Sequence, residues 1–438
     1  MSRHFPQFLI AAPSSASGKT TVSLAIMAAL TRRGMCVQPF KCGPDYIDTK
    51  FHEFVCHRSS VNLDSFMSSP AHIRSLYDHY TRDADACVVE GMMGFMDGYN
   101  RDAGSSAEIA SILQLPVVLV VDARSAAYSV APLLWGMKHY REGVNIIGVI
   151  FNKVGSPRHR AALNQVCEDV GIPCIGCVYR DPALEQSSRY LGLDFSRMSQ
   201  RLKQVDVSHI DLDLLLALAD RPLVQATNGL FDNTAYDAGR HFVIARNEES
   251  FSFIYAQHVD LLRHMGRVSF FDPEQDEPLP ADTTCLYLPG GYPEKHLNIL
   301  GRAQTALNAI RSYVDSGGRV LAECGGMMYL SRGIYTDGEP SFVPLVGALP
   351  FAISSRKASR KLHLGYRSFE YRGVLLKGHE FHYTDFADDD RPASLVEMHD
   401  ARGNIVDTPL FRSQGVLASY THLYWGETPE LLTGELFV

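Results

Sequence analysis

Near its N-terminus the chain contains the run Phe8-Leu9-Ile10-Ala11-Ala12-Pro13-Ser14-Ser15-Ala16-Ser17-Gly18-Lys19-Thr20-Thr21. An apolar strand-like segment, Phe8 to Ala12, leads into a loop of small residues, and a helical pattern follows from Thr21 to Arg33. A phosphate-binding loop needs this context, because backbone N–H groups and the positive end of the helix dipole then face the phosphates. Pro13 stands where the strict pattern has glycine, so the match depends on Gly18-Lys19-Thr20 and its flanking elements.

Short apolar runs alternate with helical stretches through the first half of the chain. The runs are Val37 to Lys41, Ala86 to Gly91, Pro116 to Asp122, Asn145 to Asn152 and Ile172 to Val178. Near-continuous Val, Ile and Leu are typical of parallel strands that are covered on both faces. This alternation predicts an α/β fold with a doubly wound parallel sheet.

A second strand–helix series begins at His241, after a stretch from about Arg201 in which the periodic pattern weakens. In this series we expect a helix over Phe251 to Met265 and a late strand over Gly415 to Tyr420. The sequence therefore predicts a P-loop domain over residues 1–220, a linker over 221–240 and a second α/β domain over 241–438.

Composition limits the classes of protein to which the chain can belong. Its 438 residues, 46% hydrophobic and 21% charged, are typical of a globular protein with two or three domains. No apolar run approaches the ~18 residues of a membrane span. The N-terminus has no signal-peptide pattern, so we expect a cytoplasmic protein whose nine cysteines are reduced. The net charge of −8 argues against nucleic-acid binding, although a locally basic cleft still admits an anionic substrate.

Residues suited to a nucleoside triphosphate lie in the loop and at the strand ends beside it. We expect Lys19 to neutralise the β- and γ-phosphate oxygens and the Thr20 hydroxyl to ligate Mg²⁺. Lys41 ends the second strand, at the sheet edge where open α/β folds bind ligands. Asn152-Lys153 ends a later strand, where it could contact the adenine or the loop. The full set expected to bind ATP is Ser15, Ser17, Gly18, Lys19, Thr20, Thr21 and Lys41.

Four carboxylates follow strand ends in the same half of the chain, at Asp45, Asp48, Glu90 and Asp97. Mg²⁺ prefers oxygen ligands and keeps several waters, so one or two carboxylates suffice. The expected metal ligands are Thr20, Asp48 and Glu90. Glu90 closes a buried strand and therefore needs a partner, whereas Asp45 and Asp97 have the alternative role of capping turns.

A second reaction centre is indicated by Arg319-Val320-Leu321-Ala322-Glu323-Cys324-Gly325-Gly326-Met327. This strand–turn–helix pattern is typical of a nucleophile elbow, which exposes the thiol at the tip of a strand. The N–H of Gly325, with Gly290 and Gly291 after the preceding strand, would face a developing oxyanion. His422 follows the late strand and is the expected base for Cys324. The alternative is a buried structural cysteine beside a core histidine.

The third member of a catalytic triad is missing from its usual place, because Tyr424 stands two residues beyond His422. Either another group orients His422, with Glu380 as one candidate, or the site is a dyad. Cys174 and Cys177 have no second cysteine pair, which argues against zinc or redox chemistry. His379-Glu380-Phe381-His382 lacks the spacing of a zinc protease helix. A basic cluster at residues 356–361 is either a solvated loop or a contact for a polycarboxylate.

Four motifs of the chain are characteristic of a known family: Pro39-Phe40-Lys41-Cys42-Gly43-Pro44-Asp45-Tyr46-Ile47-Asp48, Glu90-Gly91-Met92-Met93-Gly94, Leu288-Pro289-Gly290-Gly291-Tyr292-Pro293-Glu294 and Glu323-Cys324-Gly325-Gly326-Met327-Met328-Tyr329-Leu330. In these motifs, and over essentially its whole length, the chain resembles the cobyrinate a,c-diamide synthase family. This resemblance implies an N-terminal synthetase domain related to dethiobiotin synthetase and a C-terminal class I-like glutamine amidotransferase domain of the cobyrinic type. It also implies amidation of the a and c acetate side chains of a corrin precursor, with ATP, L-glutamine and Mg²⁺.

The resemblance assigns roles to the matching residues. It makes Cys324 the glutamine nucleophile and His422 the group that activates it, in a branch that lacks the usual glutamate. Residues that the resemblance places at the substrate or the phosphoryl intermediate are Asp45, Tyr46, Ile47, Asp48 and Asp97. Family members often have Leu where this chain has Ile47, and we expect little consequence.

Three alternatives stay open. The first is that the chain is a close relative that carries out the same amidation on hydrogenobyrinate or on a nickel tetrapyrrole such as nickel-sirohydrochlorin. The second is that it is a cobyric acid synthase, which amidates other side chains and is usually longer. A partitioning or regulatory P-loop ATPase is the third, but it has no use for a Cys–His site. The expected partner is a corrinoid polycarboxylate, with no nucleic acid and no membrane, and the protein could be a homodimer.

Overall fold

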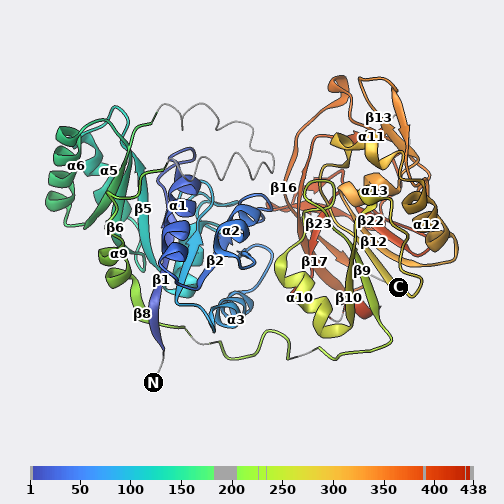
Figure 1. The fold of residues 1–438 in the computed structure, drawn as a ribbon, viewed down its shortest axis with the longest axis horizontal. Helices are drawn as coiled ribbons and strands as arrows, with labels where there is room; N and C mark the ends of the chain where they lie inside the picture. The colour runs from blue at the N-terminus through green and yellow to red at the C-terminus, as the bar shows by residue number, and fades with distance from the viewer. Residues whose placement is uncertain are drawn as a thin grey trace. The chain divides into compact units, whose positions relative to one another are not determined.

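The computed structural model describes residues 3–181, 205–224, 226–232, 234–387, 391–429 and 431–434. The chain divides into two compact units, Met1–Leu230 and Phe231–Val438, called here the N-terminal unit and the C-terminal unit (Figure 1). The domain limits expected from the sequence, 1–220 and 241–438 around a linker, stay predictions.

The N-terminal unit is built on a sheet with the strand order β3-β2-β4-β1-β5-β6-β7, and β8 pairs antiparallel with β1. The other pairs are parallel, and the order runs in both directions from β1, which confirms the predicted doubly wound sheet. The strands are β1 (His4–Ala11), β2 (Val37–Cys42), β3 (Val61–Leu63), β4 (Ala86–Glu90), β5 (Pro116–Asp122), β6 (Asn145–Val154), β7 (Cys174–Tyr179) and β8 (Asp220–Pro222).

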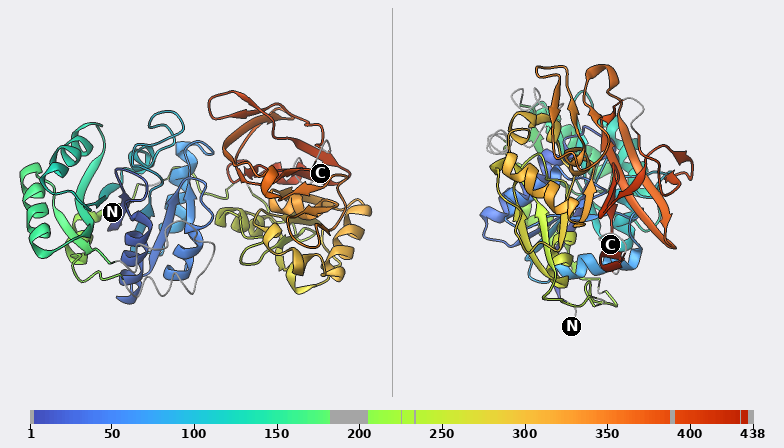
Figure 2. Two further views of the ribbon diagram at one scale, coloured as in Figure 1. Left: turned by 90° about the horizontal axis from the view of Figure 1, so that it is seen from above. Right: turned by 90° about the vertical axis from the view of Figure 1, so that its right-hand side faces the viewer.

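Apolar helix faces cover this sheet. Side chains of α1, α2 and α9 form one core with β1 and β5, and the helices flank the strands in the views of Figure 2. The helices are α1 (Lys19–Arg32), α2 (Asp48–Cys56), α3 (Pro70–Thr81), α4 (Ser106–Leu113), η1 (Tyr128–Val130), α5 (Ala131–His139), α6 (Pro157–Val170) and α9 (Leu212–Ala219). Helix α1 begins two residues before the predicted Thr21, because Gly18 takes a left-handed conformation (φ 88°) that turns the loop directly into the helix.

The C-terminal unit contains a six-stranded sheet in the order β10-β9-β11-β12-β22-β21, which is parallel except for β21. Its strands are β9 (His241–Ala245), β10 (Arg267–Phe271), β11 (Cys285–Leu288), β12 (Arg319–Glu323), β21 (Leu410–Ser413) and β22 (Val416–Ser419). Its helical segments are α10 (Ala256–Met265), η2 (Pro273–Gln275), η3 (Pro293–Lys295), α11 (Leu297–Leu300), α12 (Gln304–Asp315), α13 (Gly325–Leu330), η4 (Lys357–Ser359) and α14 (Leu431–Gly434).

Two further sheets complete this unit. An antiparallel sheet has the order β20-β19-β16-β17-β23, formed by β16 (His363–Tyr371), β17 (Val374–His382), β19 (Met398–Asp400), β20 (Ile405–Val406) and β23 (His422–Tyr424). The four-stranded sheet β14-β13-β15-β18 is formed by β13 (Gly333–Tyr335), β14 (Phe342–Pro344), β15 (Ile353–Ser354) and β18 (Asp385–Phe386). Together with the parallel sheet they confirm the predicted α/β class of the second domain.

Two sequence predictions for this unit are wrong in detail. The helix expected over Phe251 to Met265 begins only at Ala256, because Phe253 forms a β-bridge with Gly290 instead. The late strand ends at Ser419, and His422 begins a separate strand in the antiparallel sheet. Within the described ranges, no helix has both the length and the apolar character needed to cross a bilayer.

Candidate functional site

The phosphate-type loop lies between β1 and α1, and its shape is held by its own side chains and by β6. Ser17 Oγ donates to the Ser14 carbonyl (2.8 Å), and Asn152 Nδ2 donates to the Ser17 carbonyl (2.9 Å). A Cβ on Gly18 would lie 2.0 Å from Asn152 Nδ2, so only glycine fits between the loop and β6. Of the two roles expected for Asn152, the geometry supports contact with the loop.

Lys19 begins α1 and lies beside the loop that follows β4. Its Nζ donates to the Met93 carbonyl (2.8 Å). Burial, together with the neighbouring Lys41 ammonium, lowers the pKa of Lys19 to about 8. An anionic phosphate at this position would favour the charged ammonium.

A cluster of acidic and basic side chains lies at the carboxyl edge of the sheet. The strand register pairs Lys41 and Ile10 with Glu90, so the ends of β1, β2 and β4 meet there. Lys41 Nζ is 2.9 Å from Asp48 Oδ2 and 3.3 Å from Glu90 Oε1. Thr20 Oγ1 donates to Glu90 Oε1 (2.6 Å) and lies 3.4 Å from Asp48 Oδ2. The structure therefore brings together all three expected metal ligands around one lysine.

The charges in this cluster depend on one another. Burial and the neighbouring Asp45 raise the pKa of Asp48 to about 7. Burial alone would raise the pKa of Glu90, but Lys41 and His52 lower it below its ordinary range. Burial opposes the charge on Lys41, yet Glu90 and Asp48 raise its pKa well above the usual value. The resting cluster thus keeps an ionised Glu90 and a charged Lys41.

His52, on α2, was not predicted from the sequence. Its Nε2 is 2.8 Å from Glu90 Oε2 and its Nδ1 is 3.0 Å from Ser60 Oγ, and its side chain is completely buried. The available signal was its position four residues after Asp48, which places both side chains on one helix face.

The other residues expected at the substrate in the N-terminal unit lie outside the cluster around Lys41 or at its margin. Asp45 Oδ1 accepts from the N–H groups of Ile47 (2.8 Å) and Asp48 (2.9 Å), and Asp97 Oδ2 accepts from Gly94 N–H (3.0 Å). Both carboxylates therefore cap turns, which was the alternative reading. Tyr46 is buried, and Ile47 packs against the core of the N-terminal unit.

Cys324 lies in a tight turn between β12 and α13. Its backbone has φ 46° and ψ −107°, a conformation that non-glycine residues rarely adopt and that is found in nucleophile elbows. Its N–H donates to the Ser419 carbonyl of β22 (2.8 Å), and its Sγ is 4.0 Å from the Phe381 carbonyl. Burial raises the pKa of the thiol far above its ordinary range, so the resting group is a neutral thiol.

Gly290 and Gly291 connect the elbow with His422. A Cβ on Gly290 would lie 2.0 Å from His422 Cε1, so the imidazole ring packs directly on the glycine backbone. A Cβ on Gly325 would lie 2.9 Å from the Gly291 nitrogen. The three glycines expected at the oxyanion are therefore gathered between the cysteine turn and the histidine.

The His422 ring is enclosed by protein. It is 1% exposed, and its ring centroid is 5.9 Å from that of Phe253. Burial, then the neighbouring His379 and His382, lowers the pKa of His422 to about 3. The imidazole is therefore neutral near physiological pH, which is the form that a general base requires.

Glu323 precedes the cysteine and was also not predicted as a site residue. Its carboxylate accepts hydrogen bonds from Tyr287 Oη (2.7 Å) and from Leu423 N–H (3.0 Å). Burial raises its pKa to about 8. A carboxylate that closes a buried strand needs partners, and the sequence offered this signal here as it did for Glu90.

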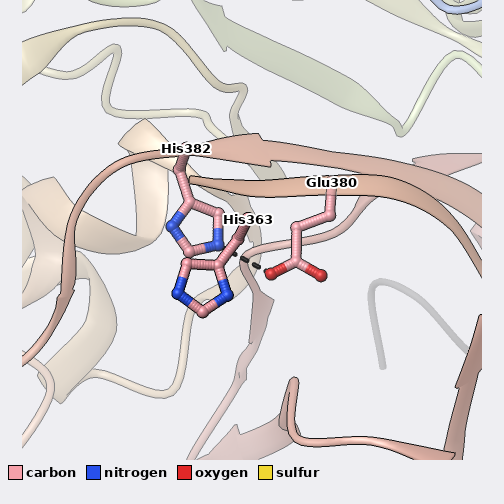
Figure 3. Close-up of side chains that lie close together, drawn as sticks. All are labelled: His363, Glu380 and His382. Atoms are coloured by element: carbon pink, nitrogen blue, oxygen red, sulfur yellow. Dashed lines mark hydrogen bonds and ion pairs between the residues drawn. The ribbon is translucent and has the colours of Figure 1, made fainter. Parts of the chain in front are cut away.

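Glu380, the candidate third member, belongs to a separate cluster on β16 and β17 (Figure 3). Its carboxylate accepts from His382 Nε2 (2.7 Å), Thr408 Oγ1 (2.7 Å) and Arg367 Nε. His382 Nδ1 lies 2.7 Å from the Thr384 carbonyl, so both ring nitrogens of His382 face oxygen atoms.

This cluster has the residue types of a metal site but not its geometry. The candidate ligand atoms of His363, Glu380 and His382 lie within 4.8 Å of one another. The two imidazole rings are stacked, however, with 4.7 Å between centroids and 3° between planes. One ion cannot lie in both ring planes, and Arg367 already neutralises the carboxylate. The arrangement therefore favours a structural ion-pair cluster.

The C-x-x-C pair and the basic cluster have the following surroundings in the structure. All nine cysteines are free thiols, Cys174 and Cys177 among them. The side chains of the basic cluster, residues 356–361, are exposed, and Arg356 lies over the Tyr335 ring (4.9 Å).

Comparison with known proteins places this geometry in a family. The model of the CobB/CobQ-like glutamine amidotransferase domain matches residues 243–430, and that of an AAA domain matches residues 6–188. The chain is 40% identical to hydrogenobyrinate a,c-diamide synthase of Brucella suis biovar 1, over 95% of this chain and 98% of that protein. It is 35% identical to the protein of that name from Streptomyces coelicolor, over 97% and 95% of the two chains. It is 36% identical to cobyrinate a,c-diamide synthase of Caldanaerobacter subterraneus, over 95% and 94%.

These matches span both units and nearly the full length of each relative. They confirm the resemblance drawn from the four sequence motifs, and with it an ATP-dependent ligase that takes its nitrogen from glutamine. The chain belongs to the family of hydrogenobyrinate and cobyrinate a,c-diamide synthases.

Proposed function

We propose that this protein converts the a and c acetate carboxylates of cobyrinate into amides, with glutamine as the nitrogen donor and ATP as the activating substrate. The observation that carries the proposal is the presence of two distinct centres in a chain of this family. One is the Gly18-Lys19-Thr20 loop with its acidic cluster, and the other is the Cys324 elbow, which packs through Gly325, Gly291 and Gly290 toward the His422 ring.

In the C-terminal unit, Cys324 attacks the side-chain amide carbon of glutamine while the neutral His422 ring accepts the thiol proton. The N–H of Gly325 and the backbone of Gly290 and Gly291 stabilise the oxyanion that forms. The protonated ring returns its proton to the leaving nitrogen, and ammonia departs. Water then cleaves the thioester and releases glutamate.

In the N-terminal unit, a substrate carboxylate attacks the γ-phosphorus of ATP and ADP leaves. Ser15, Ser17, Gly18 and Thr21 surround the phosphates, and Lys19 and Lys41 neutralise their charge. A carboxylate is a poor acyl donor, whereas its acyl phosphate has a good leaving group. Ammonia attacks that acyl phosphate, and phosphate leaves as the amide forms.

Mg²⁺ fits the donor set that we propose for it. Thr20 Oγ1, Asp48 and Glu90 are hard oxygen donors, and both carboxylates lie within 3.4 Å of Thr20 Oγ1. The Glu90 side chain is fully buried and that of Asp48 is 20% exposed. Bound by these residues, the ion would neutralise charge on the β- and γ-phosphates. Lys41 lies among the same oxygens and keeps Glu90 ionised for this role.

Asp45, Tyr46, Ile47 and Asp97 are proposed to line the position of the corrin carboxylate and its phosphorylated form. Support for the first three comes from their location, since Asp45 lies 4.0 Å from Lys41 and Tyr46 and Ile47 connect Asp45 to Asp48. Because Asp45 and Asp97 also cap turns, part of any loss on their substitution will be structural.

Hydrogenobyrinate, the ring without cobalt, is the second candidate substrate. The relatives at 40% and 35% identity are named for hydrogenobyrinate, and the relative at 36% is named for cobyrinate. Nickel-sirohydrochlorin was a third candidate from the sequence, and none of these three relatives is named for it. The cytoplasmic location and the homodimer also stay predictions.

A substrate panel tests the proposal. Purified protein is incubated with ATP, Mg²⁺ and glutamine against cobyrinate, hydrogenobyrinate and nickel-sirohydrochlorin, and the products are weighed by mass spectrometry. We expect a diamide from a corrin acid and none from nickel-sirohydrochlorin. ATP hydrolysis without an amidated product from any acid would overturn the proposal.

A further inference from the structure

Glu323 is a buried carboxylate that the proposed chemistry does not use. It is 2% exposed, it directly precedes Cys324, and it lies on β12. Burying a carboxyl group is costly unless it is hydrogen-bonded, and this one has two donors, Tyr287 Oη and Leu423 N–H. These donors belong to β11 and β23, so one side chain connects three strands of the C-terminal unit.

The hydrogen bond to Leu423 N–H fixes the backbone next to His422, the proposed base. β23 is three residues long, begins at His422 and pairs with β17. The chain leaves the parallel sheet at Ser419 and enters the antiparallel sheet at His422, so the pairing between β12 and β22 ends before the histidine. The Glu323 carboxyl group bridges this break, from the residue before the nucleophile to the residue after the base.

The imidazole itself is confined by close packing. Gly290 leaves no room for a Cβ beside the ring, and Gly378 approaches the His422 carbonyl so closely that a Cβ there would lie 2.3 Å from it. Gly290 packs against the ring and Gly378 packs against the backbone of the same residue, so a shift of β23 would also shift the ring. An anchor on the backbone of β23 therefore sets the ring as well.

We propose that Glu323 is a positioning residue, which holds His422 against Cys324 through the N–H of Leu423. This assignment rests on the proposed glutaminase role of the Cys324–His422 pair. It gives a physical account of the missing triad carboxylate at Tyr424: an acidic group still orients the histidine, but from the nucleophile strand and through the backbone.

Four full-length variants test the assignment. Glu323→Ala removes the acceptor, and Glu323→Gln keeps an amide oxygen for Leu423 while its NH₂ donates to Tyr287 Oη. Leu321→Ala, on the same strand and 1% exposed, is the matched control for a destabilised core. Cys324→Ala reports on the proposed function itself. Each variant is assayed for amide formation with glutamine and with ammonia, and its melting temperature is measured.

For Glu323→Ala we expect kcat with glutamine to fall about 100-fold, since displacement of a catalytic group by about 1 Å has that effect. KM for glutamine and the ammonia-dependent rate should stay unchanged, because those steps do not use His422. Glu323→Gln should recover most of kcat. Leu321→Ala should lower the melting temperature and keep kcat with glutamine.

The outcomes distinguish failure of the proposed function of the Cys324 site from failure of the positioning role of Glu323. If Cys324→Ala keeps glutamine-dependent activity, the proposed function of this site is wrong. If Cys324→Ala is inactive with glutamine but Glu323→Ala keeps wild-type kcat, only the positioning role is wrong. The positioning role is also wrong if Leu321→Ala loses kcat as much as Glu323→Ala at an equal loss of melting temperature.

Discussion

At the residue scale, the protonation states of the cysteine and histidine define how the site begins its reaction. Cys324 is held as a thiol by burial, and His422 is held as a neutral imidazole by burial and by neighbouring histidines. A thiolate–imidazolium pair, as in cysteine proteases, is therefore not the resting state. Proton transfer has to accompany attack on bound glutamine.

This state predicts the pH dependence of alkylation at Cys324. Only the thiolate reacts, and below its pKa the thiolate fraction rises about tenfold per pH unit. Because burial raises the pKa of Cys324 far above the ordinary value, the rate with iodoacetamide should still be rising at pH 10. The rate is measured by mass spectrometry of the peptide that contains Cys324. A plateau below pH 8 would show an activated thiolate instead.

Lys19 gives a second prediction at this scale. Replacement of Lys19 by Ala removes the ammonium expected at the β- and γ-phosphates, so amide synthesis should be lost with both glutamine and ammonia. Cys324 lies in the C-terminal unit, so it should still form a covalent adduct with a glutamine-like electrophile. Product formation and adduct mass are measured on the same sample. Loss of the adduct would show that the variant damages more than the nucleotide site.

His52 gives a third prediction, because it orients a proposed metal ligand. Partners of ligating carboxylates typically contribute 10–100-fold to metal affinity. In His52→Ala the Glu90 carboxylate loses its bond to Nε2, so the Mg²⁺ concentration for half-maximal synthesis should rise at least tenfold. His72→Ala, at a buried histidine on α3, is the control for removal of a core side chain. An identical Mg²⁺ dependence in wild type and His52→Ala would exclude this role.

At the element scale, the sequence predicted the long strands and helices of both units but missed the places where a strand or helix is interrupted. The apolar runs of β1, β2, β4, β5 and β6 were recognisable because strands buried on both faces need continuous Val, Ile and Leu. The short strand at His422 was not, since three residues carry too little periodicity to separate them from β22. Residues 251–255 have a helical pattern but lie outside α10, and Phe253 among them forms a bridge to Gly290, a contact distant in sequence.

The connection between β12 and β23 predicts how stability changes with pH. The folded chain keeps a proton on Glu323 up to pH about 8, whereas the unfolded chain loses it near the ordinary pKa of 4.5. Between these values the folded state binds more protons, so the free energy of unfolding falls as pH rises, by at most about 1.4 kcal/mol per unit from this group.

Glu323→Gln removes this contribution because the amide does not titrate. Its melting temperature should therefore fall less than that of wild type between pH 5 and 8, which thermal denaturation at several pH values measures. Parallel curves for the two proteins would show that Glu323 titrates normally.

At the scale of the whole molecule, the sequence located both centres because each contains a local motif. Gly18-Lys19-Thr20 and the Cys324 elbow are each short, and their neighbours in sequence are also their neighbours in space. The supporting contacts of His52 and Glu323 join residues 38 and 100 positions apart, so no local pattern reveals them. A buried carboxylate at a strand end was the general signal, and it was applied to Glu90 but not to Glu323.

The presence of two separate centres predicts that ammonia in solution can replace glutamine as the nitrogen source. Cys324→Ala removes the only step that needs glutamine, so glutamine-dependent synthesis should fall to background. Ammonia supplied in solution enters at the acyl phosphate, after that step, so ammonia-dependent synthesis should keep its wild-type rate. This rate should rise with pH as more of the ammonium is deprotonated, because only the neutral amine is a nucleophile. Both activities are measured as diamide formed per mole of ADP. If the variant loses both equally, release and capture of nitrogen are not separate steps, and the cysteine has to act within the synthetase reaction itself.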